Sequence, residues 1–417
     1  MPSAVVDIIA VGALVLLLVV AFWHPRGSVE VLAGTAAAGA VVASGAVDLA
    51  GAWQQVRLLL PVVAFLAGIL VMAEMCAAEG LFAAVGSLVA RASRGHPKRL
   101  LTLTFAAAAV ITATLSLDAT VVLLTPVMAS AAMAVGTSRR PVVHACARLA
   151  NSASLLFPVS NLTNLLALPA LRLSFGSFAL VMAPVWLAVI LVEYVGQRIY
   201  FAPDLSAPPE AAPVERHVEV PVLPLVVVGS ALVAFAVTSP LGVQPAWVAG
   251  SAALVLSGYA VSRRLVRPVE VVRAAHLSFG VFVLCLGIVV AGLADTFLGT
   301  AVAGLVPDGT GLRALLLVAL LSTAVANLVN NLPATLLLVP LIAPLGNTAV
   351  LAALIGLGVG SGLTYTGSLA NLLWRRTLLR HGGDASAREF HTLSAVVTLP
   401  AVVIGVVVLW AWQPLLR

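Results

Sequence analysis

Two short polar segments, roughly two hundred residues apart in apolar surroundings, are close copies of each other. The segment SNLTNLL at residues 160–166 recurs as GSLANLL at residues 367–373, with four of seven positions identical. Asparagine, serine and threonine carry amide and hydroxyl groups, which suit a neutral hydroxylated solute or a cation. The duplication therefore indicates a binding site for a small solute, built from two related halves.

Asp118 is an acid in the middle of a long apolar stretch, with no basic residue nearby in the sequence. Acids inside a membrane are costly to bury and commonly mark ion or proton pathways. The alternative role is structural: with Thr120, Asp118 would accept hydrogen bonds from free N–H groups at the start of a helix. The two roles are compatible, and we expect Asp118 to take up and release a proton.

A second apolar stretch is interrupted by Asn330 and Asn331, with Pro333 shortly after them. Proline is favoured in the first turn of a helix, so we expect a helix to begin here. The two side-chain amides are candidates to contact a solute. The alternative is that they only satisfy backbone groups freed by the interruption.

Pro158 stands just before the first copied segment, and Gly360, Gly362 and Gly367 stand before and at the start of the second. We expect these residues to break the helices, so that backbone carbonyls and hydroxyl groups become free to bind a solute. The exposed amino ends of the half-helices carry partial positive charge, which favours anions or negative dipoles. Serine and threonine also serve as packing residues in membrane helices, but the duplication favours a site. These residues are Asn151, Ser152, Ser154, Pro158, Ser160, Asn161, Thr163 and Asn164 in the first copy, and Gly360, Ser361, Gly362, Thr364, Thr366, Gly367, Ser368 and Asn371 in the second.

The remaining polar residues give weaker signals. Glu74, Glu79 and Asp295 lie near the ends of apolar stretches, and Arg148 is expected to extend its charge to the cytoplasmic surface. The three cysteines stand singly, and the sequence has no CxxC, HExxH or Walker A motif. We therefore expect no metal centre, no resident cofactor, no ATP hydrolysis by this chain and no enzymatic activity.

The elements that position these residues follow from the composition. With 61% hydrophobic and 9% charged residues, the chain is expected to be an all-α polytopic membrane protein. The stretches 100–136 and 312–344 are too long for one crossing and polar at their centres, so each is predicted as a re-entrant helical hairpin. Ten spans are expected at residues 8–23, 29–47, 57–75, 142–171, 178–200, 222–237, 246–261, 277–293, 350–375 and 392–412.

Basic residues support this layout, because cytoplasmic loops of membrane proteins are rich in lysine and arginine. With both chain termini outside, only four of the 22 Lys and Arg residues face outward. The basic residues that give the chain its net charge of +6 are thus placed mainly in cytoplasmic loops. This explains the positive charge without a nucleic-acid partner, and none is expected. The four outward residues are Arg57, Arg172, Arg313 and Arg417.

The two halves of the chain are predicted to be repeats. We expect a first repeat at residues 1–201, a proline-rich cytoplasmic linker at 202–219 and a second repeat at 220–417. Each repeat would contain five spans, with a re-entrant hairpin and a broken helix. Five is an odd number, so the two repeats are predicted to be inverted in the membrane.

The motif GSLANLLW at residues 367–374, together with ANLVNNLP at 326–333, closely resembles the arsenite/antimonite efflux permease family of the ion transporter superfamily. Residues 118–126 and 151–164 resemble the first-repeat counterparts of these motifs. The resemblance runs in order through both halves, from about residue 57 to residue 374. One position departs: Leu117 stands where the family usually has Asn before the Asp, which makes the first half-site less polar.

The resemblance implies secondary active export of arsenite or antimonite, in exchange for protons, across the cell membrane. Protons would couple through Asp118, and Na⁺ is the alternative coupling ion. The resemblance also suggests an elevator-like motion and a homodimer, and leaves a separate ATPase subunit open as a partner. By position, the implied substrate-binding residues are Asn161, Thr163, Asn164, Asn330, Asn331, Thr335, Thr366, Ser368 and Asn371.

Three alternatives remain open from the sequence. The first keeps the fold and changes the cargo, to sodium-coupled carboxylate or anion transport or to sodium/proton exchange. The second is a passive channel. The third is a membrane-embedded enzyme with Asp118 as an acid–base group, against which stands the lack of a second catalytic acid, nucleophile or metal cluster.

Overall fold

The computed structural model describes residues 3–23, 27–171, 173–206, 219–294, 296–384 and 386–412, and these are helical with no strand among them. Nine helices of the described part are long and apolar enough to cross a membrane. The chain is therefore a multi-pass helical membrane protein, as predicted. Arg172, Asp295, Arg417 and most of the predicted linker lie outside the described residues.

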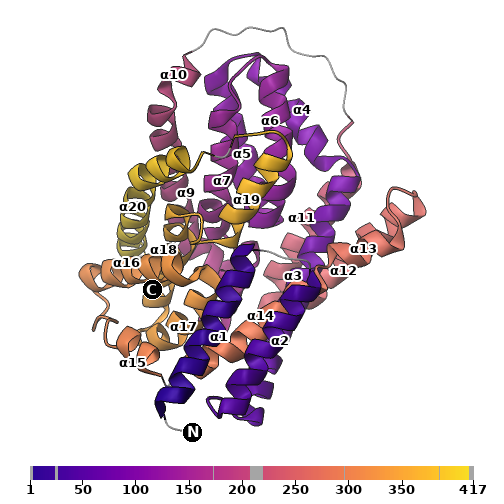
Figure 1. Ribbon diagram of the computed structural model, residues 1–417. Helices are drawn as coiled ribbons and strands as arrows, with labels where there is room; N and C mark the ends of the chain where they lie inside the picture. The colour runs from indigo at the N-terminus through magenta and orange to yellow at the C-terminus, as the bar shows by residue number, and fades with distance from the viewer. Residues whose placement is uncertain are drawn as a thin grey trace.

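Six long helices pack into one bundle, which we call the scaffold. Within it, α3 packs against both α12 and α14, α2 packs against α14, and α1 covers α2 (Figure 1). Glycines allow the close approach: a Cβ at Gly68 of α3 would come within 3.1 Å of the Gly250 nitrogen of α12. The scaffold helices are α1 (Ser3–Trp23), α2 (Gly27–Ser44), α3 (Leu49–Ala78), α11 (Val222–Thr238), α12 (Pro245–Ser262) and α14 (Leu277–Leu293).

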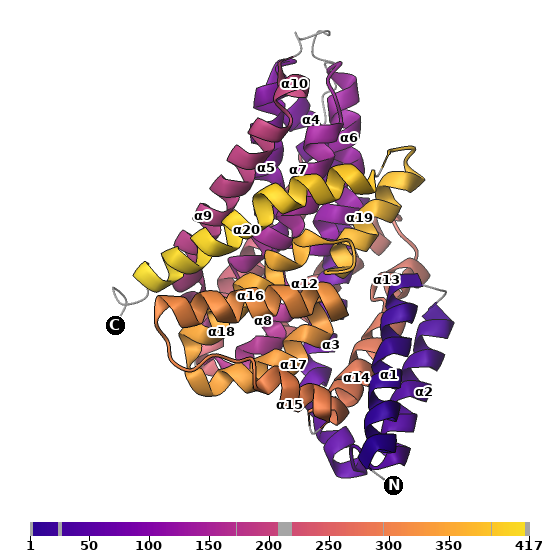
Figure 2. The same ribbon diagram turned by 60° about the vertical axis from the view of Figure 1, so that its left-hand side comes forward.

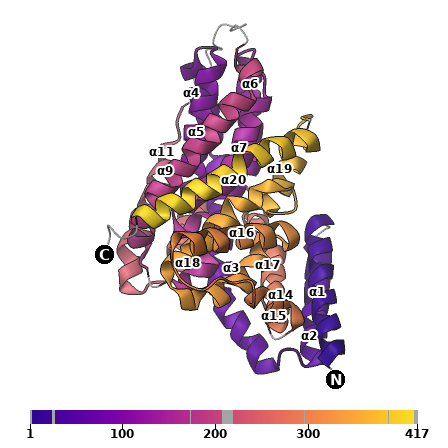
Figure 3. The same ribbon diagram turned by 90° about the vertical axis from the view of Figure 1, so that its left-hand side faces the viewer.

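Each of the two predicted hairpins is a pair of helices joined at a polar tip. In the first hairpin, α5 (Pro97–Thr114) turns back through the π-helix η1 (Ala119–Leu124) into α6 (Thr125–Ala134). In the second, α16 (Leu312–Val329) turns back at Asn330 into α17 (Asn331–Ile342). The first lies in the upper half of the molecule and the second in the lower half (Figure 3).

Both copied segments lie where a helix is broken and resumes. In the first, α7 (Arg140–Ser152) ends, short 3₁₀ turns follow, and α8 (Leu162–Ala167) continues the chain. In the second, α18 (Asn347–Gly358) is followed by the 3₁₀ turn η7 (Gly360–Leu363) and then by α19 (Leu369–Arg380). Both breaks thus fall at the predicted positions.

A long helix follows each of the two broken helices. α9 (Phe175–Tyr200) follows the first broken helix, α20 (Ala387–Trp412) follows the second, and the two pack along each other (Figure 2). Each half therefore runs through three scaffold helices, a hairpin, a broken helix and one long helix. The opposite placement of the hairpins is what inverted repeats require, while the inversion itself and the domain boundaries stay predictions.

Short helices complete the described chain. The helix that follows α3 is α4 (Leu81–Ser93), which packs against α5 and α6. The others are α10 (Ala202–Leu205), α13 (Pro268–Ala274) and α15 (Phe297–Ala303), with 3₁₀ turns η2 (Ala153–Leu155), η3 (Pro158–Ser160), η4 (Leu168–Ala170), η5 (Ser239–Leu241) and η6 (Ala343–Leu345).

Candidate substrate-binding site

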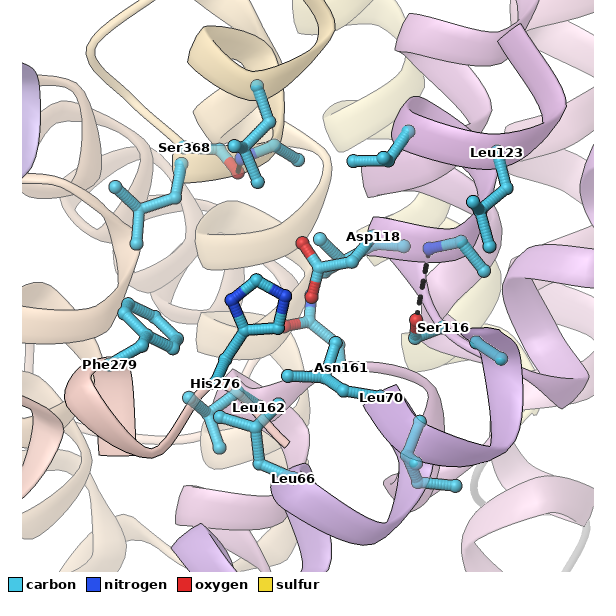
Figure 4. Close-up of a pocket in the computed structure, with 18 of the residues that line it drawn as sticks. Leu66, Leu70, Ser116, Asp118, Leu123, Asn161, Leu162, His276, Phe279 and Ser368 are labelled. Atoms are coloured by element: carbon cyan, nitrogen blue, oxygen red, sulfur yellow. Dashed lines mark hydrogen bonds between the residues drawn. The ribbon is translucent and has the colours of Figure 1, made fainter. Parts of the chain in front are cut away.

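One cavity of about 360 Å³ is lined by both hairpin tips and both helix breaks. The first tip contributes Asp118 and the second contributes Asn331, while the breaks contribute Asn161 and Ser368. Figure 4 shows Asp118, Asn161 and Ser368 directed into the same space. Segments more than two hundred residues apart in the chain therefore form a single polar site.

The first tip leaves the carboxylate of Asp118 available to the cavity. The hydroxyl of Ser116 accepts a hydrogen bond from the backbone N–H of Ala119 at 3.2 Å and so caps the second arm of the hairpin. Asp118 makes no such capping bond and has no hydrogen bond or ion pair with any residue that the structure describes. Of the two roles considered for Asp118, the structure assigns the cap to Ser116.

A π-helix follows directly after Asp118. The backbone N–H of Thr125 bonds to the carbonyl of Thr120, five residues earlier, and the Thr125 hydroxyl donates to the same carbonyl at 3.0 Å. Across the hairpin, the hydroxyls of Thr112 and Thr120 are 2.7 Å apart. Single-turn π-helices are rare and occur frequently at functional sites. Thr120 therefore holds the two arms of the hairpin together behind Asp118.

At the second tip, the two asparagines have separate roles. Asn330 has φ 73° and ψ 153°, a strained backbone conformation, and its amide donates to the carbonyl of Thr366 at 3.0 Å. Its side-chain oxygen accepts from the backbone N–H of Leu332 at 3.4 Å, so Asn330 holds the turn. The backbone N–H of Asn331 donates to the carbonyl of Gly367, and the Asn331 side chain lines the cavity.

The first break is stabilised by its own asparagines. Asn161 is extended, with φ −145° and ψ 137°, and its side-chain oxygen caps α8 by accepting from the N–H of Thr163 at 3.0 Å. Asn164 donates from its amide to the carbonyls of Ser154 at 2.8 Å and Phe157 at 3.1 Å. The carbonyls freed by the break are thus satisfied from within the segment.

The second break repeats this pattern at the corresponding positions. Ser368 has φ −144° and ψ 142°, and its hydroxyl caps α19 by accepting from the N–H of Ala370 at 3.2 Å. Asn371 donates from its amide to the carbonyls of Ser361 at 3.0 Å and Thr364 at 2.8 Å. The duplication seen in the sequence is therefore a duplication of backbone geometry and hydrogen bonding.

The nine predicted substrate-binding residues and the predicted proton-coupling residue Asp118 divide into two groups in the structure. Asp118, Asn161, Asn331 and Ser368 line the cavity. The other residues are not part of its lining, and most of them bond to backbone at the tips and breaks. These are Thr163, Asn164, Asn330, Thr335, Thr366 and Asn371.

Five charged or titratable residues of the cavity lining were not among the residues predicted to bind substrate: Glu30, Glu74, His276, Arg376 and Arg380. Glu30 of α2 is buried, and its charge interacts with that of Arg376. Glu30 lies at the edge of the predicted span 29–47, four residues after Arg26, so it did not stand out in the sequence as Asp118 did. His276 and the arginines carry no signal in the sequence, because only the fold brings them to the cavity.

The prediction that Arg148 reaches the cytoplasmic surface was wrong. Arg148 is buried and makes a bidentate ion pair with Glu193 of α9, at 3.0 Å and 2.6 Å. The guanidinium also donates to the carbonyl of Gly362 at 2.7 Å and to the hydroxyl of Ser394, and Ser152 donates to Glu193. The buried carboxylate of Glu193 satisfies the guanidinium inside the protein, which removes the need to reach water. The pair joins the first broken helix to the second break and to α20.

The described residues contain no cluster of His, Cys, Asp and Glu that would hold a metal ion, and Cys76, Cys146 and Cys285 are buried and unpaired. Broken helices and hairpin tips that enclose one polar cavity within a helical membrane protein are the architecture of a secondary transporter. The chain belongs to the CitMHS family, described as "Citrate transporter", whose sequence model matches residues 4–355.

Curated relatives are named "Arsenical pump membrane protein". That of Yersinia enterocolitica is 27% identical over 418 residues, which covers 94% of this chain and 96% of the relative. That of Escherichia coli (strain K12) is 28% identical over 416 residues, with the same coverage. The resemblance inferred from the motifs is thus confirmed, and the chain is a membrane transporter.

A solved structure shares the fold. The chain is similar to the Alcanivorax borkumensis YdaH transporter, with a TM-score of 0.56 and 18% sequence identity. The match covers 88% of this chain and 90% of that one. At this identity, the likeness concerns the fold alone.

Proposed function

We propose that this protein exports arsenite or antimonite across the cell membrane in exchange for protons. The observation that carries the proposal is the convergence of both hairpin tips and both helix breaks on one cavity that contains Asp118. The relatives named as arsenical pump membrane proteins support the cargo.

The lining suits a small neutral hydroxide. Arsenite is largely an uncharged triol at neutral pH, and such a solute both donates and accepts hydrogen bonds. Asn161, Asn331 and Ser368 offer amide and hydroxyl groups to it. Thiolates would bind trivalent arsenic tightly and hinder its release, and none of the buried cysteines lines this cavity.

The exchange would use Asp118 as the proton carrier. In the state that faces the cytoplasm, Asp118 loses its proton and the solute enters. In the state that faces outward, the solute leaves and Asp118 is protonated again. The hairpins and broken helices would move together against the scaffold, so that one site serves both faces.

Inside-out membrane vesicles test this proposal. Arsenite and antimonite uptake is measured with and without an imposed inside-acid pH gradient. We expect accumulation that depends on the gradient and disappears when an ionophore removes it. Folded protein that accumulates neither solute would overturn the assignment, and uptake without gradient-driven accumulation would indicate a channel.

A second candidate function is transport of a carboxylate. The family description and the presence of Arg376 and Arg380 on the cavity favour it, because guanidinium groups bind carboxylates. Citrate uptake with and without a sodium gradient separates the two candidates. Sodium-driven citrate uptake without metalloid transport would support the carboxylate function.

The partners expected from the resemblance are part of the same proposal. A homodimer would keep the scaffold fixed while the hairpin-bearing parts move. A separate ATPase subunit would dock on the cytoplasmic loops. Mass measurement of the purified protein in detergent tests the dimer, and co-purification from the native host tests the subunit.

A further inference from the structure

His276 is placed at the cavity by an unusual backbone. It is the residue before α14, and its φ of 44° and ψ of 47° lie in the left-handed region. Histidine visits this region more often than most residues, but the conformation is still uncommon. His276 keeps its backbone in local hydrogen bonds: its N–H bonds to the carbonyl of Arg273 and its carbonyl accepts from Phe279 and Gly280. The strained turn therefore directs the His276 side chain to the cavity. The imidazole takes no part in the hydrogen bonds that hold the turn.

The imidazole of His276 faces Asp118 across the cavity. Figure 4 shows the ring beside the Asp118 carboxylate and Asn161, and all three line the same cavity. The ring makes no hydrogen bond or ion pair with any described residue, and it caps no helix. A free imidazole opposite a free carboxylate is an arrangement suited to proton transfer, directly or through one water.

The two residues belong to parts of the molecule that the proposed motion separates. His276 begins scaffold helix α14 and follows the loop of basic residues that is predicted to be cytoplasmic, whereas Asp118 lies on a hairpin tip. The other charged groups at the cavity are the acids of α2 and α3 and the arginines of α19. They are Glu30, Glu74, Arg376 and Arg380.

We propose that His276 relays the proton of Asp118 to the cytoplasm, a role that rests on the proposed proton exchange. Asp118 gives its proton through cavity water to the neutral ring of His276. The imidazolium then releases that proton to cytoplasmic water, which leaves Asp118 ionised and His276 neutral. Histidine suits this task because its charge changes near physiological pH. When the hairpin moves outward, Asp118 leaves the relay and the proton path to the cytoplasm closes.

The test measures two fluxes in proteoliposomes that contain the full chain. Net metalloid flux driven by a pH gradient requires proton release in every cycle. Exchange of labelled for unlabelled metalloid at equal pH replaces solute by solute and needs none. We expect His276→Asn, which tolerates the left-handed backbone, to lower net flux about tenfold or more while exchange changes less than about twofold.

Chemical rescue separates a relay from a structural role. His276→Gly also tolerates the backbone and leaves space for a small base. Imidazole added on the cytoplasmic side is expected to restore net flux in this variant. The matched control is His96→Asn, because His96 is an exposed residue before α5 that does not line the cavity.

Normal net flux in His276→Asn overturns the relay, and so does an equal loss of both fluxes without imidazole rescue. Loss of net flux in Glu74→Gln but not in His276→Asn would place the relay on α3 instead and overturn the proposal. A wild-type protein that neither accumulates nor exchanges metalloid overturns the proposed function and the relay with it.

Discussion

At the scale of single residues, the first hairpin tip divides capping and chemistry between two neighbours. The hydroxyl of Ser116 caps the second arm, so the Asp118 carboxylate is not needed to hold the turn. We expect Asp118→Asn to abolish transport driven by a pH gradient while the protein still inserts and melts at a near-normal temperature. Vesicle uptake and thermal melting in detergent check this, and wild-type-like coupling in the variant would remove Asp118 from the proton path.

Ser116→Ala is expected to have the opposite effect to Asp118→Asn: it lowers stability and leaves proton coupling intact. Loss of its cap is expected to cost about 1 kcal/mol of stability. Proton coupling should persist in this variant, because Asp118 is still present. A variant that melts normally but loses its dependence on the pH gradient would contradict this division of roles.

The two asparagines of the second tip make a second pair. Asn330 carries the strained backbone and the bond to Thr366, so Asn330→Ala is expected to lose about 1–3 kcal/mol of stability. Asn331 presents its side chain to the cavity, so Asn331→Ala should raise the KM for the solute and leave the melting temperature nearly unchanged. Melting curves and concentration-dependent uptake of both variants test this, and the reverse result would exchange their roles.

Residues of the cavity could be predicted from the sequence only where a polar side chain interrupts an apolar stretch. Asp118, Asn161, Asn331 and Ser368 were found in this way and line the cavity. His276 could not be found, because a histidine after a basic loop is unremarkable until the fold brings the start of α14 to the cavity that Asp118 lines.

At the scale of helices, one buried ion pair joins three elements. Arg148 of α7 and Glu193 of α9 are both buried, and Arg148 also bonds to Gly362 at the second break. Asn151 extends the link, since its amide donates to the side-chain oxygen of Asn371 at 2.7 Å. These contacts tie the two broken helices together, so that they would move as one body.

We expect Glu193→Gln to destabilise the protein by about 3–5 kcal/mol, because it leaves the Arg148 charge buried without its partner. The double variant Arg148→Leu with Glu193→Leu should recover much of the loss, since no unpaired charge remains. Apparent melting temperatures of the two variants check the order. A double variant that is less stable than Glu193→Gln would contradict it.

Helices were predictable from the sequence where apolar runs were long, and their breaks where glycine, proline and asparagine gathered. The boundaries of the hairpins and of both broken helices fell close to the predicted residues. Arg148 and Glu193 show the limit: each is a charged residue in an apolar stretch, and nothing in the sequence pairs residues on different helices.

At the scale of the whole molecule, the cavity connects the hairpin tips with residues near the predicted cytoplasmic ends of three helices. Glu30, His276 and Arg380 belong to α2, the start of α14 and α19. In the predicted orientation these helix ends face the cytoplasm, and we expect the cavity to open to that side. The orientation is open to a direct test.

Impermeant maleimide labelling gives this test, with a low background because the three native cysteines are buried. Ser278→Cys lines the cavity at a partly exposed position and should react in inside-out vesicles. Thr310→Cys lies in an exposed loop after α15 and should react only in right-side-out vesicles. Saturating solute is expected to slow the labelling of Ser278→Cys, and reaction of both sites from one face would reject the predicted topology.

The hydrogen-bond frame shared by the two helix breaks bears on how such proteins diversify. Asn164 and Asn371 satisfy the broken carbonyls from within the chain, so the backbone needs no cargo to hold its shape. The cavity-facing cap is asparagine in one copy, Asn161, and serine in the other, Ser368, and both residue types cap helices well. The two copies therefore differ at this position while they keep the same backbone geometry. We therefore expect substitutions at the cavity-facing caps to change the cargo and leave the fold intact, in keeping with a chain that belongs to a family described as "Citrate transporter" and is similar to arsenical pump membrane proteins.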